Sequence, residues 1–405
     1  MTVLKGKVVV IGVCGGIAAY KSADLVSKLK KLNAEVHVIM TRSACEFIKP
    51  LTFQSLSQNA VIEDMFEKPR AWEIEHISLA QKADVFVVAP ATANIIGKVA
   101  NGIADDMLST TVMAAKCPVI FAPAMNCNMY ENPIVQQNIQ KLKDFDYLFV
   151  EPGYGRLACG DIGKGKLADT DDILDRIIET AAYDKDLAGH KVLVTAGPTR
   201  ESIDPVRFIT NYSSGKMGYA IAKAAKYRGA EVILVTGPTD LSPIKGIKTI
   251  PVNTALEMHD AVMEHFKDAT LIIKSAAVGD YRPVETSENK IKKNEGFLEM
   301  KLIKNPDILM ELGAGITHQV LIGFSMETQN LEGYAKEKLT KKNLDMIIAN
   351  DLSQQGAGFS VDTNIVTILD RSGSMERLPK MAKDRLAHII LEKGLSIYKQ
   401  KNRII

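Results

Sequence analysis

The sequence predicts an α/β protein built from two doubly wound, mostly parallel-sheet domains of the flavodoxin-like or Rossmann-like kind. Each half opens on an apolar strand, KVVVIG at Lys7 and KVLVTAG at Lys191, and a glycine-containing stretch then leads into a helix. A second strand, EVHVIMT or EVILVTG, follows each opening at roughly the length of one βαβ unit, about thirty residues. With 405 residues, the chain is also long enough for two or three domains.

The first predicted domain spans residues 1–183. The helix after its opening strand carries Leu25, Leu29 and Leu32 at helical spacing, and Asn33 is placed to end that helix. Near-continuous apolar runs are typical of parallel strands that are buried on both faces of a sheet. The expected strands are KVVVIGV, EVHVIMT, VFVVAP, VIFAPA and YLFV.

The second predicted domain spans residues 184–405, and the polar connector AAYDKDLAGH at 181–190 marks the boundary. Its expected strands are KVLVTAG, EVILVTG, KTIPV, TLIIKSAAV, VLIGFSM and MIIAND. The apolar face of its first helix, which Gly229 ends, consists of Met217, Ala220, Ile221, Ala224 and Ala225. In doubly wound sheets ligands bind at the carboxyl ends of the strands, so we expect one site in each domain.

Composition argues against several classes of protein. A formal charge of +2 gives no basic field for a nucleic acid. No apolar run approaches the roughly 20 residues of a membrane span, and no secretory leader is recognised. The five cysteines form no CxxC pair, which favours neither a disulfide framework nor a zinc site. We therefore expect a cytoplasmic protein with reduced thiols.

Loops after strands of the first half favour a phosphate-bearing ligand. The glycine loop lacks the full GxGxxG pattern, and hydroxyl side chains stand where a ribose-binding carboxylate would follow the second strand. Backbone N–H groups at helix starts bind phosphate, so a mononucleotide such as FMN is favoured over NAD. Plain strand–helix turns remain the alternative. The candidate contacts are Gly15, Gly16, Thr41, Ser43, Thr92 and Asn94.

Three further residues of the first half are candidates because they follow strands or lie in glycine-rich loops. His76 stands in EHISLA, Asn126 in PAMNCNMYENP and Cys159 in RLACGDIGKGKL. Each has an ordinary alternative: a structural histidine, a turn asparagine and an inert thiol. With a usual pKa near 8.5, a cysteine is mostly protonated at pH 7, so Cys159 suits proton donation better than nucleophilic attack.

The first half resembles the flavin-dependent phosphopantothenoylcysteine decarboxylases in the strings GGIAAYKS, APATAN, PAMNCNMY and ACGDIG. The resemblance implies that His76 is the active-site base, that Asn126 holds the substrate carboxylate and that Cys159 is the proton donor. It also implies that FMN oxidises the CH2–SH group to a thioaldehyde, which accepts the electrons left by departing CO2. The protein then orients a cofactor that performs the difficult step.

The second half holds a dense polar stretch, TAGPTRESIDPVRFITNYSSGKMG, which leads into its first helix. Ser213 or Ser214 is an N-cap candidate, and GxxxxGK[ST] is absent, which excludes a standard P-loop. Lys338 and Lys342 lie before the strand MIIAND, and Asp280 follows another strand. This combination favours a triphosphate, with Asp280 as a candidate ligand of Mg2+.

This half resembles phosphopantothenate–cysteine ligases in the strings IDPVR, SSGKMG, DYRP, KIKK and KNPDIL. The resemblance implies that CTP activates 4'-phosphopantothenate as an acyl-cytidylate, which the amine of cysteine then attacks. Asn211 matches the residue that stabilises this intermediate, and Lys290 matches a lysine on a lid over the phosphates. The implied CTP positions are Ser275, Ala276, Asp280, Lys290, Asn305, Pro306, Asp307, Ile308, Phe324, Lys338 and Lys342.

The order of the halves, decarboxylase before ligase, is similar to that of the bifunctional proteins of coenzyme A biosynthesis. By this resemblance we expect a homo-oligomer, because the decarboxylases form trimers and the ligases form dimers. Two other classes of protein are alternatives: a non-catalytic flavin-binding regulator, which predicts loss of His76 or Cys159, and a nicotinamide-dependent oxidoreductase, which predicts GxGxxG followed by an acidic residue at a strand end. Residues alone leave open whether CTP or ATP is used.

Overall fold

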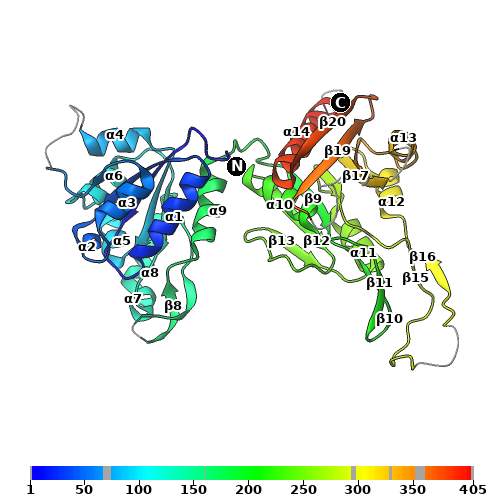
Figure 1. Ribbon diagram of the computed structural model, residues 1–405, viewed down its shortest axis with the longest axis horizontal. Helices are drawn as coiled ribbons and strands as arrows, with labels where there is room; N and C mark the ends of the chain where they lie inside the picture. Colours follow the sequence, from blue (N-terminus) through cyan, green and yellow to red (C-terminus); the bar gives the residue numbers. More distant parts are fainter. Residues whose placement is uncertain are drawn as a thin grey trace. The chain divides into compact units, whose positions relative to one another are not determined.

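The computed structural model describes residues 2–66, 74–158, 160–292, 298–327, 331–351 and 361–402, without the side chains of 327, 331, 332 and 351. The chain divides into two compact units, Met1–Tyr183 and Asp184–Ile405 (Figure 1). This division falls within the polar stretch at 181–190. Each unit is an α/β structure with its own sheet and its own core, as the alternating pattern predicts.

The first unit contains a fully parallel six-stranded sheet in the order β3-β2-β1-β4-β5-β6. This is a Rossmann order, and its direction of winding reverses between β1 and β4. The five predicted strands are confirmed, and the short edge strand β3 was not predicted. In chain order the strands are β1 (Val8–Val13), β2 (Glu35–Met40), β3 (Val61–Ile62), β4 (Val85–Ala91), β5 (Val119–Pro123) and β6 (Leu148–Phe149).

Helices cover both faces of this sheet, which explains why its strands read as continuous apolar runs. One face carries α1 (Ala19–Lys31), α3 (Pro50–Ser57) and α9 (Thr170–Ala181), with α1 and α9 side by side in Figure 1. Asn33 has a φ of 63°, as expected for the residue that ends α1. The other face carries α4 (Glu75–Lys82), α5 (Ala93–Ala100), α6 (Met107–Ala114), α7 (Cys127–Glu131) and α8 (Pro133–Asp144); α2 (Arg42–Cys45) follows β2.

The second unit contains an eight-stranded sheet in the order β13-β12-β9-β14-β17-β18-β19-β20. Its first six strands are parallel and repeat the winding of the first unit, with the reversal between β9 and β14. The last two are antiparallel and were not predicted. In chain order the strands are β9 (Lys191–Ala196), β12 (Glu231–Thr236), β13 (Lys248–Pro251), β14 (Leu271–Lys274), β17 (Val320–Glu327), β18 (Met346–Asp351), β19 (Thr363–Asp370) and β20 (Met375–Ala382).

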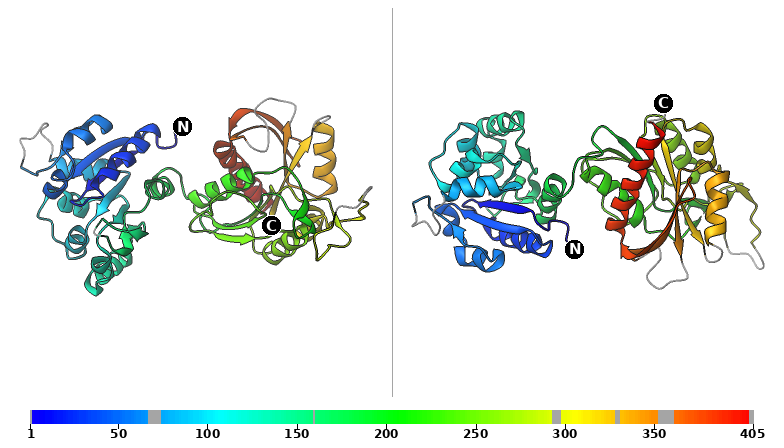
Figure 2. Two further views of the ribbon diagram at one scale, coloured as in Figure 1. Left: turned by 60° about the horizontal axis from the view of Figure 1, so that its bottom comes forward. Right: turned by 90° about the horizontal axis from the view of Figure 1, so that it is seen from above.

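Helices α10 (Lys216–Tyr227) and α14 (Lys383–Lys401) pack together on one face of this sheet, where the red α14 is visible in Figure 2. The opposite face carries α11 (Ala255–His265), α12 (Ile308–Gly315) and α13 (Leu331–Lys341). Two hairpins project from the sheet in Figure 1 and contact each other through β10 and β15. They are formed by β10 (Arg200–Asp204) with β11 (Arg207–Thr210) and by β15 (Tyr281–Pro283) with β16 (Leu302–Lys304).

The start of α10 differs from the prediction in its cap. Gly215 is the N-cap residue with a φ of 75°, and no side chain caps the helix, so neither Ser213 nor Ser214 has that role. The predicted apolar face and the end at Gly229 are confirmed, with Gly229 at a φ of 87°. Glycine is favoured at Gly215 and Gly229 because other residues rarely adopt positive φ.

Gly218 allows α10 to approach β9 closely. A Cβ atom at this position would lie 2.6 Å from the Cβ of Ala196 and 2.9 Å from the carbonyl oxygen of Thr195. Both neighbours belong to strand β9, which is paired on both sides, so moving either of them would disrupt the sheet. Gly97 in α5 has a similar helical setting, but its nearest neighbour would be the Asn138 amide at 3.7 Å.

We therefore expect Gly218→Ala to destabilise the second unit by about 1–2 kcal/mol, since overpacking outweighs the gain in helix propensity. The matched change Gly97→Ala has room for the new methyl group and should be neutral or stabilising by up to about 1 kcal/mol. Urea unfolding followed by circular dichroism compares the two variants with the parent. Equal stability of the two variants would contradict the close-approach role of Gly218.

Candidate functional site

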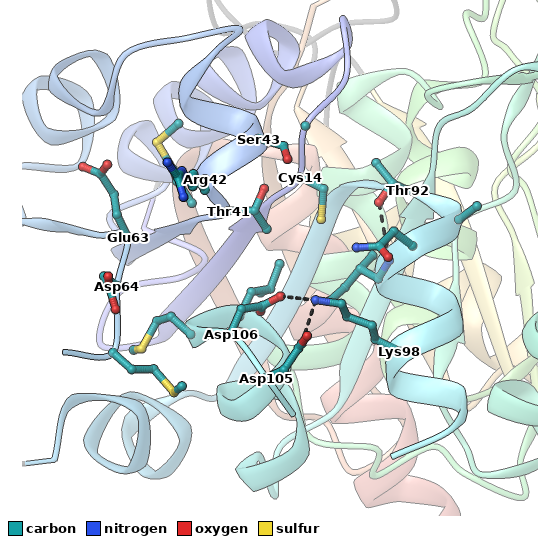
Figure 3. A pocket seen from close by; sticks show the side chains of 18 of the residues that line it. Cys14, Thr41, Arg42, Ser43, Glu63, Asp64, Thr92, Lys98, Asp105 and Asp106 are labelled. Carbon is teal, nitrogen blue, oxygen red and sulfur yellow. Dashed lines mark hydrogen bonds and ion pairs between the residues drawn. The ribbon is translucent and has the colours of Figure 1, made fainter. Parts of the chain in front are cut away.

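A pocket of about 610 Å³ lies at the carboxyl edge of the first sheet, beside the ends of β1, β2 and β4 (Figure 3). This is where the winding direction reverses, and ligands of such sheets bind there. Five of the six candidate flavin contacts lie on its wall: Gly15, Thr41, Ser43, Thr92 and Asn94. The sixth, Gly16, follows Gly15 directly but does not line the pocket.

The wall around Gly15 depends on the absence of a side chain. A Cβ atom on Gly15 would lie 2.4 Å from the Cβ of Ser43, so only glycine lets the two loops meet. Thr41 caps α2 by accepting a hydrogen bond from the Ala44 amide at 3.2 Å, and Thr92 caps α5 through the Ile95 amide at 3.4 Å. Hydroxyls and helix starts therefore converge on one spot, an arrangement suited to a phosphate.

The same pocket also holds a charged group that no sequence motif predicts. The Nζ atom of Lys98 lies 2.6 Å from Asp105 and 2.7 Å from Asp106. Figure 3 marks both interactions with dashed lines. Burial favours a higher pKa for the Asp106 carboxyl, but hydrogen bonds from Lys98 and Ser109 outweigh burial and hold the pKa below its usual value. No local motif signals this cluster, because Lys98 lies on α5 and both carboxylates lie in the loop before α6.

Among the described residues that line this pocket, Cys14 is the only cysteine. The residue is buried, and burial raises the pKa of its thiol to about 12 against opposing hydrogen bonds with Thr92. At neutral pH the side chain is therefore protonated and packs as a small apolar group. The raised pKa therefore argues against Cys14 as a nucleophile.

Asn126 lies at the start of α7 and is held in a fixed orientation. Its Oδ1 atom accepts a hydrogen bond from the Asn128 amide at 2.8 Å, and its Nδ2 group donates to Asp161 at 3.0 Å. Asp161 is two residues beyond Cys159, which itself lies outside the described residues. Met129, on the same short helix, lines the pocket, so α7 joins Asn126 to the pocket wall.

Glycines of the GDIGKGK stretch allow a hairpin, which was not predicted, to pack against α7. Strands β7 (Gly153–Arg156) and β8 (Ile162–Lys166) are antiparallel, and the Met125 amide donates to the Gly165 carbonyl at 3.0 Å. A Cβ atom on Gly165 would lie 2.4 Å from the Met125 oxygen, and one on Gly163 would lie 2.7 Å from the Cβ of Cys127. The hairpin therefore reaches the Asn126 turn only because both residues are glycines.

A carboxylate at the base of the hairpin ties it to two helices. Glu151 accepts hydrogen bonds from Lys164 at 2.8 Å, from Lys143 at 3.0 Å and from the Tyr130 hydroxyl at 3.0 Å. Burial favours a higher pKa for Glu151, but these three donors together lower it to about 2. The carboxylate is therefore ionised throughout the physiological range and connects β8 to α7 and α8.

His76 lies in the first turn of α4 and is half-buried. Helix α4 packs on α6, whose Met107 and Leu108 line the pocket, but His76 does not line it. Residues 67–73, just before this helix, lie outside the described part of the chain. Within the described residues, the structure therefore joins Asn126 to Asp161 and to the pocket wall, whereas His76 is not among the residues that line the pocket.

In the second unit, the loop after β14 is bound by two predicted asparagines. Asn211 donates to the Val278 carbonyl at 3.0 Å, and Asn305 donates to the Gly279 carbonyl at 2.8 Å. The backbone amide of Asn305 also donates to the Asp280 carbonyl at 2.9 Å. Ser275 and Ala276 begin this loop, so residues far apart in the sequence meet at the carboxyl edge of the second sheet.

The remaining candidates gather around the start of α12. Asp307 caps this helix through the Met310 amide at 3.1 Å and forms an ion pair with Lys342 at 2.9 Å. Burial favours a higher pKa for Asp307, but the hydrogen bond from Lys342 outweighs it, and the pKa is lowered. Lys338 donates to the Phe324 carbonyl at 3.2 Å. Pro306 and Ile308 flank the capping residue, so six predicted positions share one region.

Lys290 is exposed in the connection between β15 and β16. Its neighbour Ile291 is held by the β10–β11 hairpin, because its amide donates to Asp204 at 3.1 Å and its carbonyl accepts from Arg207 at 2.8 Å. Residues 293–297 lie outside the description.

In the described ranges there is no group of three or more acidic, histidine or cysteine side chains arranged for a metal, at Asp280 or elsewhere. No described helix is long and apolar enough to cross a membrane.

Comparisons with known proteins match both units. The family model described as Flavoprotein matches residues 2–182, and the one described as DNA/pantothenate metabolism flavoprotein C-terminal domain matches residues 187–397. The chain is similar to the coenzyme A biosynthesis bifunctional protein of Bacillus subtilis, with 48% identity over 400 residues and 98% of each chain covered. The Haemophilus influenzae protein of the same description is 44% identical, with 96% of this chain and 98% of that protein covered.

The connections of Glu151 generate a prediction about the hairpin. Glu151→Gln removes the charge that binds Lys143 and Lys164, so amides of β7 and β8 should exchange with solvent up to about fivefold faster, equivalent to about 1 kcal/mol. Asp144→Asn removes an exposed carboxylate at the end of α8 and serves as the control. Hydrogen exchange measured by mass spectrometry distinguishes the two, and unchanged exchange in Glu151→Gln would show that the carboxylate does not hold the hairpin.

In the parent protein, protonation of Glu151 at low pH should have the same effect on hydrogen exchange in the hairpin as the Glu151→Gln substitution. The pKa of Glu151 in the folded protein lies below its usual value near 4.3, so its stabilisation is complete above that pH. It is lost as the pH falls toward about 2. Exchange in the hairpin, corrected for the intrinsic rate, should therefore accelerate below about pH 4 in the parent but not in Glu151→Gln.

Proposed function

Because this chain belongs to the family of coenzyme A biosynthesis bifunctional proteins, we propose that its two units carry the two reactions at separate sites. The chain is a flavoprotein enzyme with the activities of a phosphopantothenoylcysteine decarboxylase and a phosphopantothenate–cysteine ligase. We assign the decarboxylase to residues 1–183 and the ligase to residues 184–405. Ligation comes first, since it makes the compound that the decarboxylase consumes.

The pocket at the carboxyl edge of the first sheet is the proposed FMN site. Its support is the convergence of Gly15, Ser43 and the capping hydroxyls of Thr41 and Thr92 on one spot, with Asn94 and a volume within the range of cofactor pockets. Bound FMN would supply a two-electron acceptor for the CH2–SH group of the substrate.

The chain's own residues then bind the substrate and move its protons. Asn126, oriented by Asp161 and Asn128, would present its amide to the carboxylate that leaves as CO2. His76 is the proposed base that takes a proton from the substrate, and Cys159 is the proposed donor that returns one. The support for their joint action is the hydrogen bond from Asn126 to Asp161, which is two residues beyond Cys159 in the sequence.

The carboxyl edge of the second sheet is the proposed CTP site. A carboxylate does not condense with an amine until its oxygen becomes a good leaving group, so CTP would convert 4'-phosphopantothenate to an acyl-cytidylate with release of pyrophosphate. Asn211 would stabilise that intermediate, Lys290 would cover the phosphates, and Asp280 would contact Mg2+. The supporting observation is the meeting of Asn211 and Asn305 on the loop after β14, beside the Asp307–Lys342 pair.

The assembly and the location of the protein follow from the same proposal. We propose a homo-oligomer in which decarboxylase units form trimers and ligase units form dimers, so that a site can include residues of two subunits. We place the reactions in the cytoplasm, where the free thiols of Cys14, Cys45, Cys117 and Cys127 remain reduced.

The proposed proton donor predicts a partial reaction. Cys159→Ser should still consume phosphopantothenoylcysteine and release CO2, but it should form little of the reduced product, because a serine hydroxyl is a far weaker acid than a thiol. Mass spectrometry of the products, with bound flavin followed by its absorbance, separates the two half-reactions. Normal formation of 4'-phosphopantetheine by this variant would remove Cys159 from the donor role.

Because the two proposed sites are separate, a substitution in the ligase site should reduce ligation without reducing decarboxylation. Asn211→Asp places a negative charge beside the anionic acyl-cytidylate, so we expect ligation to fall by at least about a hundredfold, or about 2.7 kcal/mol. Decarboxylation of supplied phosphopantothenoylcysteine should stay within twofold of the parent. Assays of each reaction alone provide the comparison, and equal loss of both activities would indicate a folding defect in place of a specific role.

A further inference from the structure

The last residue of β14 is a buried lysine, and its ammonium group forms no ion pair with any described residue. Lys274 is only 7% exposed, and the contact of its Nζ group is the Met258 sulfur at 3.9 Å. A thioether is a weak acceptor, and an ammonium group buried without a strong acceptor is costly. The run LIIK otherwise consists of buried apolar residues, so packing alone would favour another apolar side chain here.

Two charged groups of the proposed nucleotide site act on this amine. Burial is the main cause that lowers the pKa of Lys274 from 10.5 to about 7, while Asp307 opposes the change and Lys342 adds to it. Asp307 caps α12, and Lys342 follows α13. These two helices and α11, which contributes Met258, share the face of the sheet toward which Lys274 points.

An independent observation on the neighbouring strand points to a ligand at the same place. Ser325 is only 2% exposed, and its hydroxyl has no hydrogen-bond partner within the described residues. It lies two residues beyond Gly323, which pairs with Lys274, so it faces the same side as the lysine. A Cβ on Gly323 would meet Leu309 and Leu344, which identifies that side as the α12–α13 face. A buried donor without an acceptor is rare.

We propose that Lys274 is a buried cationic element of the nucleotide site and takes up a proton when the triphosphate ligand binds. The inference rests on the proposed ligase function and adds a residue that the sequence analysis did not assign to the site. The free site avoids a buried charge by leaving the amine largely neutral above pH 7. An incoming polyanion favours the charged form of a nearby amine, so the lysine becomes charged only when its counter-charge arrives.

The direction of the pH effect follows from linkage. Below about pH 7 the amine already carries its proton, and binding takes up little. At pH 8, about one unit above that pKa, only roughly one molecule in ten carries it, so binding should take up close to one proton. Affinity for the nucleotide should therefore fall by up to about tenfold per pH unit above pH 7, until the pKa of the complex is reached.

Calorimetric titration of the FMN-loaded, full-length protein with CTP and Mg2+ at pH 8 tests this proposal. The same titration in two buffers of different ionisation enthalpy gives the number of protons taken up. Lys274→Met removes the amine and keeps the length of the side chain. Lys267→Met removes an exposed lysine before the other end of β14 and controls for the loss of one charge. Protonation of CTP itself contributes equally to all three titrations and cancels.

We expect the parent and Lys267→Met to take up close to one proton more than Lys274→Met, whose affinity should lose the decline above pH 7. Equal proton uptake by the parent and Lys274→Met would overturn the proposal. So would absence of pH-dependent affinity in the parent, which decides the question even if the variant does not fold. Failure of CTP to bind the parent at any pH would be a different result and would overturn the proposed ligase function.

Discussion

Close approach of backbone segments at the carboxyl ends of the parallel strands is a constraint that the two units share. In the first unit Gly15 lets the loop after β1 meet Ser43 with no room for a Cβ atom. In the second unit Gly218 brings α10 against β9 in the same manner. The carboxyl ends of parallel strands lie at one edge of the sheet, together with the helix starts that follow them and their unpaired N–H groups. Glycines at this edge allow these segments to come close together, and the N–H groups can then bind a phosphate-bearing ligand.

The two units use this shared winding for different chemistry. The first supplies a pocket with neutral hydroxyls and a Lys98–Asp106 pair, together with a glycine hairpin that reaches Asn126. The second lengthens its sheet by two antiparallel strands and gathers lysines around the Asp307 cap. The electrostatic contrast matches the ligands that we propose, because a triphosphate requires more positive charge than one phosphate of a flavin.

The sequence was most informative where local patterns decide the structure. Apolar runs predicted eleven strands that the structure contains, and Asn33 and Gly229 mark the ends of α1 and α10. The hairpin of β7 and β8 was missed because its glycines lower strand propensity while they permit contact with α7. Strands β19 and β20 were also missed.

Features of the sites that bring together residues from distant segments could not be predicted from local sequence patterns. The Lys98–Asp105–Asp106 cluster forms between a helix and a loop, and the burial of Lys274 depends on three helices that the strand LIIK does not reveal. The proposed phosphate contacts were predictable because they follow strands directly. The proposed role of Cys159 rests on resemblance, since that residue lies outside the described ranges.

Incubation of the purified, FMN-loaded protein with 4'-phosphopantothenate, cysteine, CTP and Mg2+, followed by mass spectrometry, tests the account most directly. The account predicts 4'-phosphopantetheine with release of one CO2, one CMP and one pyrophosphate for each molecule formed. A preparation that binds FMN and remains folded but forms neither phosphopantothenoylcysteine nor its decarboxylated product would contradict the assignment of the two units.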